Sequence, residues 1–172
     1  LFTHIASRQS TQAMADALGA FRGTDRRFQP RGESHGVRVI DDYAHHPTEV
    51  AAVLTMARTV AGEGKVHVIF QPHLYSRTVT FADQFATALS KADTVILTEI
   101  YRARENYRTD VTSEIVTDQI DGARYVPQMA DAAREIAAAA APGDLVLTLG
   151  AGDITTLAPA IVAALDLHLG SP

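Results

Sequence analysis

The sequence contains no cysteine among its 172 residues. Without cysteine, the chain can form neither a disulfide scaffold nor a thiolate metal site. It also has no apolar run close to the ~18 residues that a membrane-spanning helix needs. Its first residues, Leu1–Ile5, lack the charged and then apolar layout of a signal peptide. These absences predict a cytoplasmic protein with no membrane partner.

Basic charge is also scarce. Only two lysines accompany thirteen arginines, and the net charge is −5 at pH 7. No run of Lys and Arg offers the positive surface that nucleic acid requires, so we expect no nucleic-acid partner. The composition is 47% hydrophobic and the mean hydropathy is close to zero, which excludes a disordered chain. The length suits one domain, or one domain with an appended segment.

Two motifs of phosphate and metal chemistry are missing as well. The chain has no G-x-x-x-x-G-K-[ST] sequence, so it carries no P-loop for nucleotide phosphates. It has no H-E-x-x-H sequence either, which removes the usual zinc-protease interpretation.

What the chain does have is a regular alternation of apolar and amphipathic segments. The expected strands are 28–31, 37–41, 65–70, 94–98, 124–126 and 144–149, and the expected helices are 51–60, 81–89, 112–120, 130–141 and 159–167. Such alternation is typical of a parallel sheet with right-handed crossovers. Pro30 confines strand 28–31 to an edge, antiparallel to 37–41. We therefore predict an α/β fold: a Rossmann-like three-layer domain with a mostly parallel sheet of about six strands and one antiparallel edge strand.

The densest group of polar residues follows strand 37–41. Seven side chains that accept, donate or titrate lie within Asp41–Glu49, and Pro47 suits the first position of the next helix. Open α/β sheets bind ligands where a strand ends and a helix begins, so this stretch predicts a binding site. Each residue taken singly also fits a structural role, such as a helix cap for an aspartate. A metal site is less well supported, because the adjacent His45 and His46 would point to different sides.

Polar loops also follow the other parallel strands, at His73–Arg77, Tyr101–Glu105 and Gly150–Asp153. The carboxyl ends of parallel strands share one edge, so we expect these loops to converge there. A guanidinium such as that of Arg77 grips a carboxylate or phosphate with two parallel bonds, although a solvated surface charge is the competing interpretation. The Gly150–Gly152 segment fits either an anion cradle or a tight turn.

Three motifs together resemble the C-terminal domain of the Mur ligase family. They are Asp41–Glu49 (Asp-Asp-Tyr-Ala-His-His-Pro-Thr-Glu), Gln71–Thr78 (Gln-Pro-His-Leu-Tyr-Ser-Arg-Thr) and Gly150–Ile154 (Gly-Ala-Gly-Asp-Ile). The likeness runs from about Ala13 to the end of the chain. The first motif is shared with family members that recycle murein tripeptide, and the second points to the members that add L-alanine.

The resemblance implies a division of the chain and a reaction. Family members have a domain for the UDP-sugar, a central P-loop ATPase and a C-terminal Rossmann-like domain. Residues 1–22, of which 10–22 have the pattern of an amphipathic helix, would then end the central domain, 23–27 would be the hinge, and 28–172 would be the C-terminal domain. The implied activity is an ATP-dependent ligase of peptidoglycan precursor synthesis. ATP phosphorylates the carboxylate of UDP-N-acetylmuramate, Mg²⁺ bridges the phosphates, and the amine of L-alanine attacks the acyl phosphate.

The resemblance also assigns residues. Arg27 matches a hinge arginine that contacts nucleotide, and Asp42 matches an aspartate that grips the ribose hydroxyls. The amino-acid side of the site corresponds to Tyr43, His45, His73 and Arg77. The catalytic residues would be Arg27, His45 and Arg77. Some relatives carry arginine where this chain has Leu74, and no metal ligand is expected in this domain.

Two alternatives remain at this point. One is the C-terminal domain of a ligase that recycles murein tripeptide, and the other is a stand-alone module that binds a nucleotide or anion. With either ligase, the absence of a P-loop predicts that the 172-residue chain alone has no ligase activity.

Overall fold

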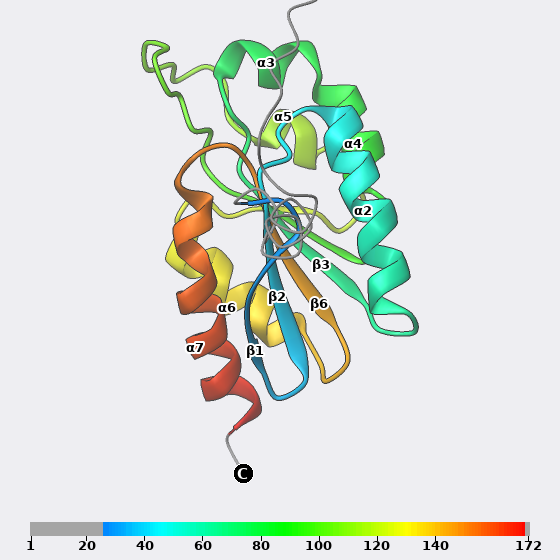
Figure 1. Ribbon diagram of the computed structural model, residues 1–172. Helices are drawn as coiled ribbons and strands as arrows, with labels where there is room; N and C mark the ends of the chain where they lie inside the picture. The colour runs from blue at the N-terminus through cyan, green and yellow to red at the C-terminus, as the bar shows by residue number, and fades with distance from the viewer. Residues whose placement is uncertain (1–25, 171–172) are drawn as a thin grey trace, which may run out of the picture.

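The computed structural model describes residues 26–170 (Figure 1). The helix expected at 10–22 and most of the hinge expected at 23–27 lie outside the described residues, so this division of the chain remains a prediction. None of the helices within 26–170 is long and apolar enough to cross a membrane.

Six strands form one sheet in the order β1-β2-β6-β3-β4-β5. Their bounds are β1 Gln29–Ser34, β2 Val37–Asp42, β3 Val66–Phe70, β4 Thr94–Leu97, β5 Arg124–Tyr125 and β6 Leu145–Leu149. β1 pairs with β2 antiparallel, and every other neighbouring pair is parallel. The predicted fold class, including the antiparallel edge strand, is confirmed.

Helices cover both faces of the sheet (Figure 1). Their bounds are α2 Pro47–Ala61, α3 Tyr75–Thr80, α4 Ala82–Leu89, α5 Glu114–Thr117, α6 Met129–Ala139 and α7 Ala158–Leu169, with a 3₁₀ turn, η1, at Asp153–Leu157. One core lies between the sheet and α2, α4 and α5, and another lies between the sheet and α6, η1 and α7. The central strands β3 and β6 are buried along their whole length, which explains their unbroken apolar runs.

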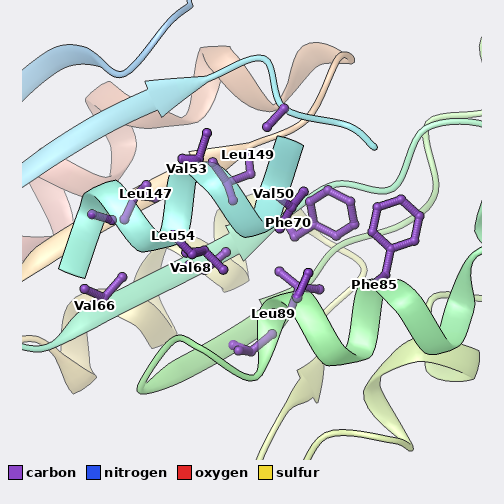
Figure 2. Packing of buried hydrophobic residues seen from close by; sticks show 14 of the residues in the cluster. Val50, Val53, Leu54, Val66, Val68, Phe70, Phe85, Leu89, Leu147 and Leu149 are labelled. Atoms are coloured by element: carbon purple, nitrogen blue, oxygen red, sulfur yellow. The ribbon is translucent and has the colours of Figure 1, made fainter. Parts of the chain in front are cut away.

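Figure 2 shows the first of these cores from close by. Val50, Val53 and Leu54 of α2 point at the apolar side chains of β3 and β6, as their helical spacing requires. Phe70 and Phe85 meet with ring centroids 5.1 Å apart. This packing fixes α2 over the sheet, and with it the polar turn that enters α2.

Several element boundaries differ from the sequence-based expectations. β1 extends to Ser34, because His35 and Gly36 both adopt positive φ and close a two-residue hairpin. A helix, α3, already begins at Tyr75 inside the loop expected at His73–Arg77, so Arg77 lies within a helix. The helix expected at 112–120 is a single turn at Glu114–Thr117.

Candidate functional site

The carboxyl ends of β2, β6 and β3 lie side by side, because β6 pairs with β2 on one side and with β3 on the other. The chain leaves β2 and β3 toward the face of α2 and α4, and it leaves β6 toward the opposite face, where α7 lies (Figure 1). Ligands bind at such a switch point in open α/β sheets. We call this edge the rim: residues 43–46, 71–74 and 150–152, with the loop 98–113 beside them.

Four rings form a row along the rim. The ring centroids of Tyr43 and His45 are 5.1 Å apart, those of His45 and His73 are 5.9 Å apart, and those of His73 and Tyr101 are 5.6 Å apart. A backbone bridge between His73 and Tyr101 holds the loop after β4 against the loop after β3. The row therefore joins three loops that are far apart in the sequence, as the convergence argument predicted.

Arg77 stands next to this row. It lies one helical turn after His73, and its Nη1 is 3.4 Å from His73 Nδ1. Burial, followed by the charge of Arg77, lowers the pKa of His73, and His45 and Arg104 add to this effect. His73 is therefore neutral at pH 7, and the guanidinium of Arg77 supplies positive charge there without a carboxylate partner in the described residues.

Glu49 organises the entrance to α2. One of its carboxylate oxygens, Oε2, accepts the N–H groups of His45 at 3.1 Å and His46 at 3.2 Å. Burial acts to raise the pKa of Glu49, but these hydrogen bonds and the charges of His45 and Arg27 outweigh it and lower the pKa. The charge of Arg27, itself an exposed residue, thus acts on the same turn as His45.

His45 is held in one tautomer by its own turn. Its Nδ1 lies 3.0 Å from the carbonyl oxygen of Tyr43, and a carbonyl oxygen only accepts, so Nδ1 carries the hydrogen. In the neutral ring this leaves a lone pair on Nε2. Of the predicted site residues, the structure thus brings Tyr43, His45, His73 and Arg77 together.

Asp42 lies deeper than these residues. Only 3% of it is exposed, and its two oxygens accept the N–H groups of Phe28 at 2.7 Å and Ala44 at 2.8 Å. Each carboxylate oxygen has two lone pairs, so acceptor capacity remains. The carboxylate thus holds the backbone on both sides of the rim, a role that the sequence did not indicate.

The loop Gly150–Gly152 fits closely into the rim. Gly150 has a φ of +146°, and a Cβ there would lie 2.7 Å from the carbonyl oxygen of Gln71. At Gly152 a Cβ would lie 2.4 Å from Gln71 Oε1 and 2.6 Å from the ring of Tyr101. Close packing and a tight turn are enough to explain these glycines, which favours the turn over the anion cradle.

A hollow of about 550 Å³ adjoins the rim at Tyr101. Its lining includes Gln71, Tyr75, Glu99, Tyr107 and Asp153. Within residues 26–170 no group of three or more His, Asp or Glu residues is placed to hold a metal ion.

The β1–β2 hairpin contains the sequence pattern of a hydrolase nucleophile elbow, because Gly32–Gly36 reads G-x-S-x-G. A nucleophile elbow needs a strand-to-helix turn that exposes the serine. Here Ser34 ends an antiparallel strand, is 5% exposed, and donates its hydroxyl hydrogen to Asp166 rather than to a histidine. The hairpin is therefore a structural element and not a hydrolase site.

Sequence reasoning missed Arg26, whose guanidinium contacts Asp41 and the Gly150–Gly152 loop. Its position beside Arg27 was the only signal in the sequence. Its partners Asp41 and Gly150 are 15 and 124 positions away, and contacts over such separations cannot be predicted from local sequence patterns.

The chain is similar to known proteins in sequence and in structure. A family model described as "Mur ligase, glutamate ligase domain" matches residues 26–152. The chain is 54% identical over 153 residues to a UDP-N-acetylmuramate–L-alanine ligase of Paenarthrobacter aurescens, covering 89% of this chain and 33% of that protein. It is 46% identical to the ligase of the same name from Saccharopolyspora erythraea, covering 93% of this chain and 34% of that protein.

A solved structure is similar too. The crystal structure of the UDP-N-acetylmuramate-alanine ligase MurC from Thermotoga maritima superimposes with a TM-score of 0.69 at 29% identity, covering 90% of this chain and 36% of that chain. The chain therefore spans about a third of the length of the relatives that it matches.

Proposed function

The chain belongs to the Mur ligase family, and from this membership we propose that it is the C-terminal domain of an ATP-dependent ligase that joins L-alanine to UDP-N-acetylmuramate. The observation that carries the proposal is the uncompensated guanidinium of Arg77 beside a neutral His73 and a tautomer-fixed His45. These three groups suit a substrate that has a carboxylate to be held and an amine to be deprotonated.

On the amino-acid side, Arg77 grips the carboxylate of L-alanine with two parallel hydrogen bonds. His73 stays neutral, so it can accept or donate a hydrogen bond beside Arg77 without adding a second full charge. Tyr43 and His45 border the same space from the turn after β2. The rim thereby orients the amine. When two reactants must meet, fixing their orientation in advance removes a large part of the reaction barrier.

In the bond-forming step, the amine nitrogen attacks the carbonyl carbon of the acyl phosphate. A C–N bond forms, the C–O bond to phosphate breaks, and inorganic phosphate leaves with the electron pair. The surplus proton of the amine passes to His45 Nε2, whose lone pair is available because Nδ1 donates to Tyr43. The ADP comes from the earlier phosphorylation of the muramate carboxylate by ATP.

On the nucleotide side, Asp42 and Arg27 are the assigned residues. Asp42 meets the ribose hydroxyls with its remaining acceptor capacity, and Arg27 reaches the nucleotide from the hinge. Mg²⁺ accompanies ATP in such transfers and neutralises charge on the phosphates. From the family resemblance we propose that the residues that hold the ion, and the P-loop, belong to the upstream domains. We place the central and N-terminal domains before residue 23 and expect the complete protein to work in the cytoplasm.

The test is a ligation assay with the complete parent protein. With ATP, Mg²⁺, UDP-N-acetylmuramate and L-alanine, we expect one amide product detected by mass, and one ADP and one phosphate for each amide. Murein tripeptide in place of L-alanine is the matched rival substrate. A preference for the tripeptide would make the parent a recycling ligase, and nucleotide binding without any amide would leave only a binding module.

A further inference from the structure

Arg26 connects the start of the described chain to the rim with several bonds. Its Nε donates to Asp41 Oδ2 at 3.1 Å, its Nη1 donates to the carbonyl oxygen of Gly152 at 3.2 Å, and its Nη2 donates to that of Gly150. The guanidinium carbon also lies 5.0 Å from the ring centre of Tyr43. One side chain thus joins the ends of β2 and β6 and a ring of the site.

The backbone around Arg26 is held in an unusual conformation. Arg26 has a φ of +59° and Phe28 a φ of +45°, which are left-handed values that side-chain-bearing residues rarely adopt. Such a conformation persists only where its surroundings determine it. Here the carbonyl of Arg26 accepts the N–H of Tyr43 at 2.8 Å, and the N–H of Phe28 donates to Asp42. Arg27, between them, has its direction set by these anchors.

We propose that Arg26 is a positioning residue that locks the entry of the chain onto the rim and thereby fixes how Arg27 and Tyr43 face the substrates. Neutralising the buried carboxylate of Asp41 is not its main task. Arg31 also reaches Asp41 Oδ2, at 3.5 Å, and Thr148 and Thr155 donate to the same carboxylate. Among residues 26–170, Arg26 alone combines that carboxylate with the two loop carbonyls.

This difference supplies a matched control. Arg26→Ala removes the lock, whereas Arg31→Ala removes a partner of the same carboxylate but no contact with the loop carbonyls. Arg26→Lys keeps a charge beside Asp41, yet a single ammonium cannot reproduce the fork that spans carboxylate and carbonyls.

The first measurement is amide hydrogen exchange on the complete protein, read relative to the amides of β3. The reporters are the N–H of Tyr43, which donates to Arg26, and the N–H of Gly150, which donates to the carbonyl of Asp42. We expect both amides to exchange at least tenfold faster than in the wild type in Arg26→Ala. In Arg31→Ala their exchange rates should stay within about threefold of the wild-type rates. Unchanged exchange in Arg26→Ala would overturn the lock, whatever the activity of the protein.

The second measurement is kinetic, and it rests on the proposed ligase function. Because Arg27 on the nucleotide side and Tyr43 on the amino-acid side both lose their fixed direction, we expect kcat/KM for ATP and kcat/KM for L-alanine each to fall at least tenfold in Arg26→Ala. In Arg26→Lys we expect a melting temperature close to that of the wild type, while kcat/KM stays as low as in Arg26→Ala. Faster exchange with normal kinetics would overturn the positioning role. If the wild-type parent makes no amide, the proposed function fails, while the exchange result still decides the lock.

Discussion

Arg77 and His73 show how a neighbouring charge and burial together determine the protonation state of a side chain. With Nη1 of Arg77 3.4 Å from His73 Nδ1, the protonated imidazole is disfavoured both by burial and by this like charge. The pair therefore presents one cation and one neutral ring. Under the proposed function, this single cation is the group that holds the carboxylate of L-alanine.

The prediction at this scale concerns Arg77→Lys in the complete protein. Lysine keeps the charge and loses the fork, and a charge-assisted hydrogen bond is worth about 1.5–3 kcal/mol. Since 1.4 kcal/mol is tenfold, the KM for L-alanine should rise at least about tenfold, with an equal or greater rise in Arg77→Ala. The KM values for ATP and UDP-N-acetylmuramate should stay within about a factor of two.

The control for this experiment is Arg38→Lys. Arg38 lies at the amino end of β2, opposite the rim, and donates to the carbonyl of Val60. It should leave all three KM values unchanged. A normal L-alanine KM in Arg77→Lys would refute the assignment, and an equal rise for ATP would place Arg77 on a phosphate instead.

How far the sequence could identify single residues depended on what each residue touches. His45, His73 and Arg77 follow strands of a parallel sheet, so their convergence was predictable from the order of elements. The hydrogen bond that Asp42 accepts from the Phe28 N–H was not predictable, since the two residues are 14 positions apart in the sequence. Arg26 was missed because its partners at positions 150 and 152 are brought near only by the completed sheet.

Among the elements, β3 and β6 are joined by a buried pair at the end opposite the rim. His67 Nε2 lies 2.9 Å from Asp144 Oδ2, and Asp144 also accepts the N–H groups of Lys65 and Ala141, each at 2.8 Å. Burial acts to raise the pKa of Asp144, but these hydrogen bonds and the His67 charge outweigh it and lower the pKa. The charged carboxylate therefore ties together the starts of two central strands.

The pH dependence follows from this direction. A carboxyl whose pKa is lower in the folded protein contributes stability above its unfolded pKa, near 3.9, and loses it as the pH falls through the folded value. The Asp144 contribution should therefore be complete at neutral pH, begin to be lost at about pH 4, and disappear once the pH falls below the lowered pKa of the folded protein. The acid sensitivity of the fold should decrease when Asp144 is replaced.

We expect Asp144→Asn to lower stability at pH 7, because hydrogen bonds to a charged group contribute about 1.5–3 kcal/mol. For a domain of this size that corresponds to a fall of roughly 3–12 °C in melting temperature. The difference from wild type should narrow below about pH 4. Thermal melts from pH 7 to pH 2.5 measure both effects, with Asp118→Asn, at an exposed position, as the control. If the melting temperatures of Asp144→Asn and wild type differed by the same amount at every pH, the predicted link between Asp144 ionisation and stability would be contradicted.

Element boundaries were predictable where one periodicity dominates. α2 follows its apolar stripe and begins at Pro47, as proline at a first helical position suggested. The helix α3 was missed because Gln71–Thr78 is polar and its N-cap, Leu74, has a φ of +72°, which no local propensity predicts. α5 is shorter than predicted because a single buried face at Val116 and Thr117 is enough to close that edge.

For the whole molecule, the order of strands explains why sequence reasoning reached the fold. Five parallel strands with crossover helices and one hairpin leave few arrangements that obey the rules of connection. The position of β6 between β2 and β3 was not predicted in detail, since it depends on a crossover from β5 that passes beneath β3 and β4. That insertion brings Gly150–Gly152 to the centre of the rim.

The same view of the molecule separates what this chain contributes from what its relatives contain. It spans about a third of their length and contains no P-loop sequence, and residues 26–170 form a six-stranded sheet with a core on each face. Under the proposed function, this domain presents the amino acid and part of the nucleotide site, and phosphate activation takes place elsewhere in the parent protein.

The measurement that tests this central claim most directly is phosphate release by the pure 172-residue chain, with circular dichroism confirming that it is folded. The assay contains ATP, Mg²⁺, UDP-N-acetylmuramate and L-alanine, and the complete parent protein serves as the positive control. The account predicts a folded α/β spectrum and no phosphate above the rate without protein. Phosphate release that increases in proportion to the concentration of the isolated chain would contradict it.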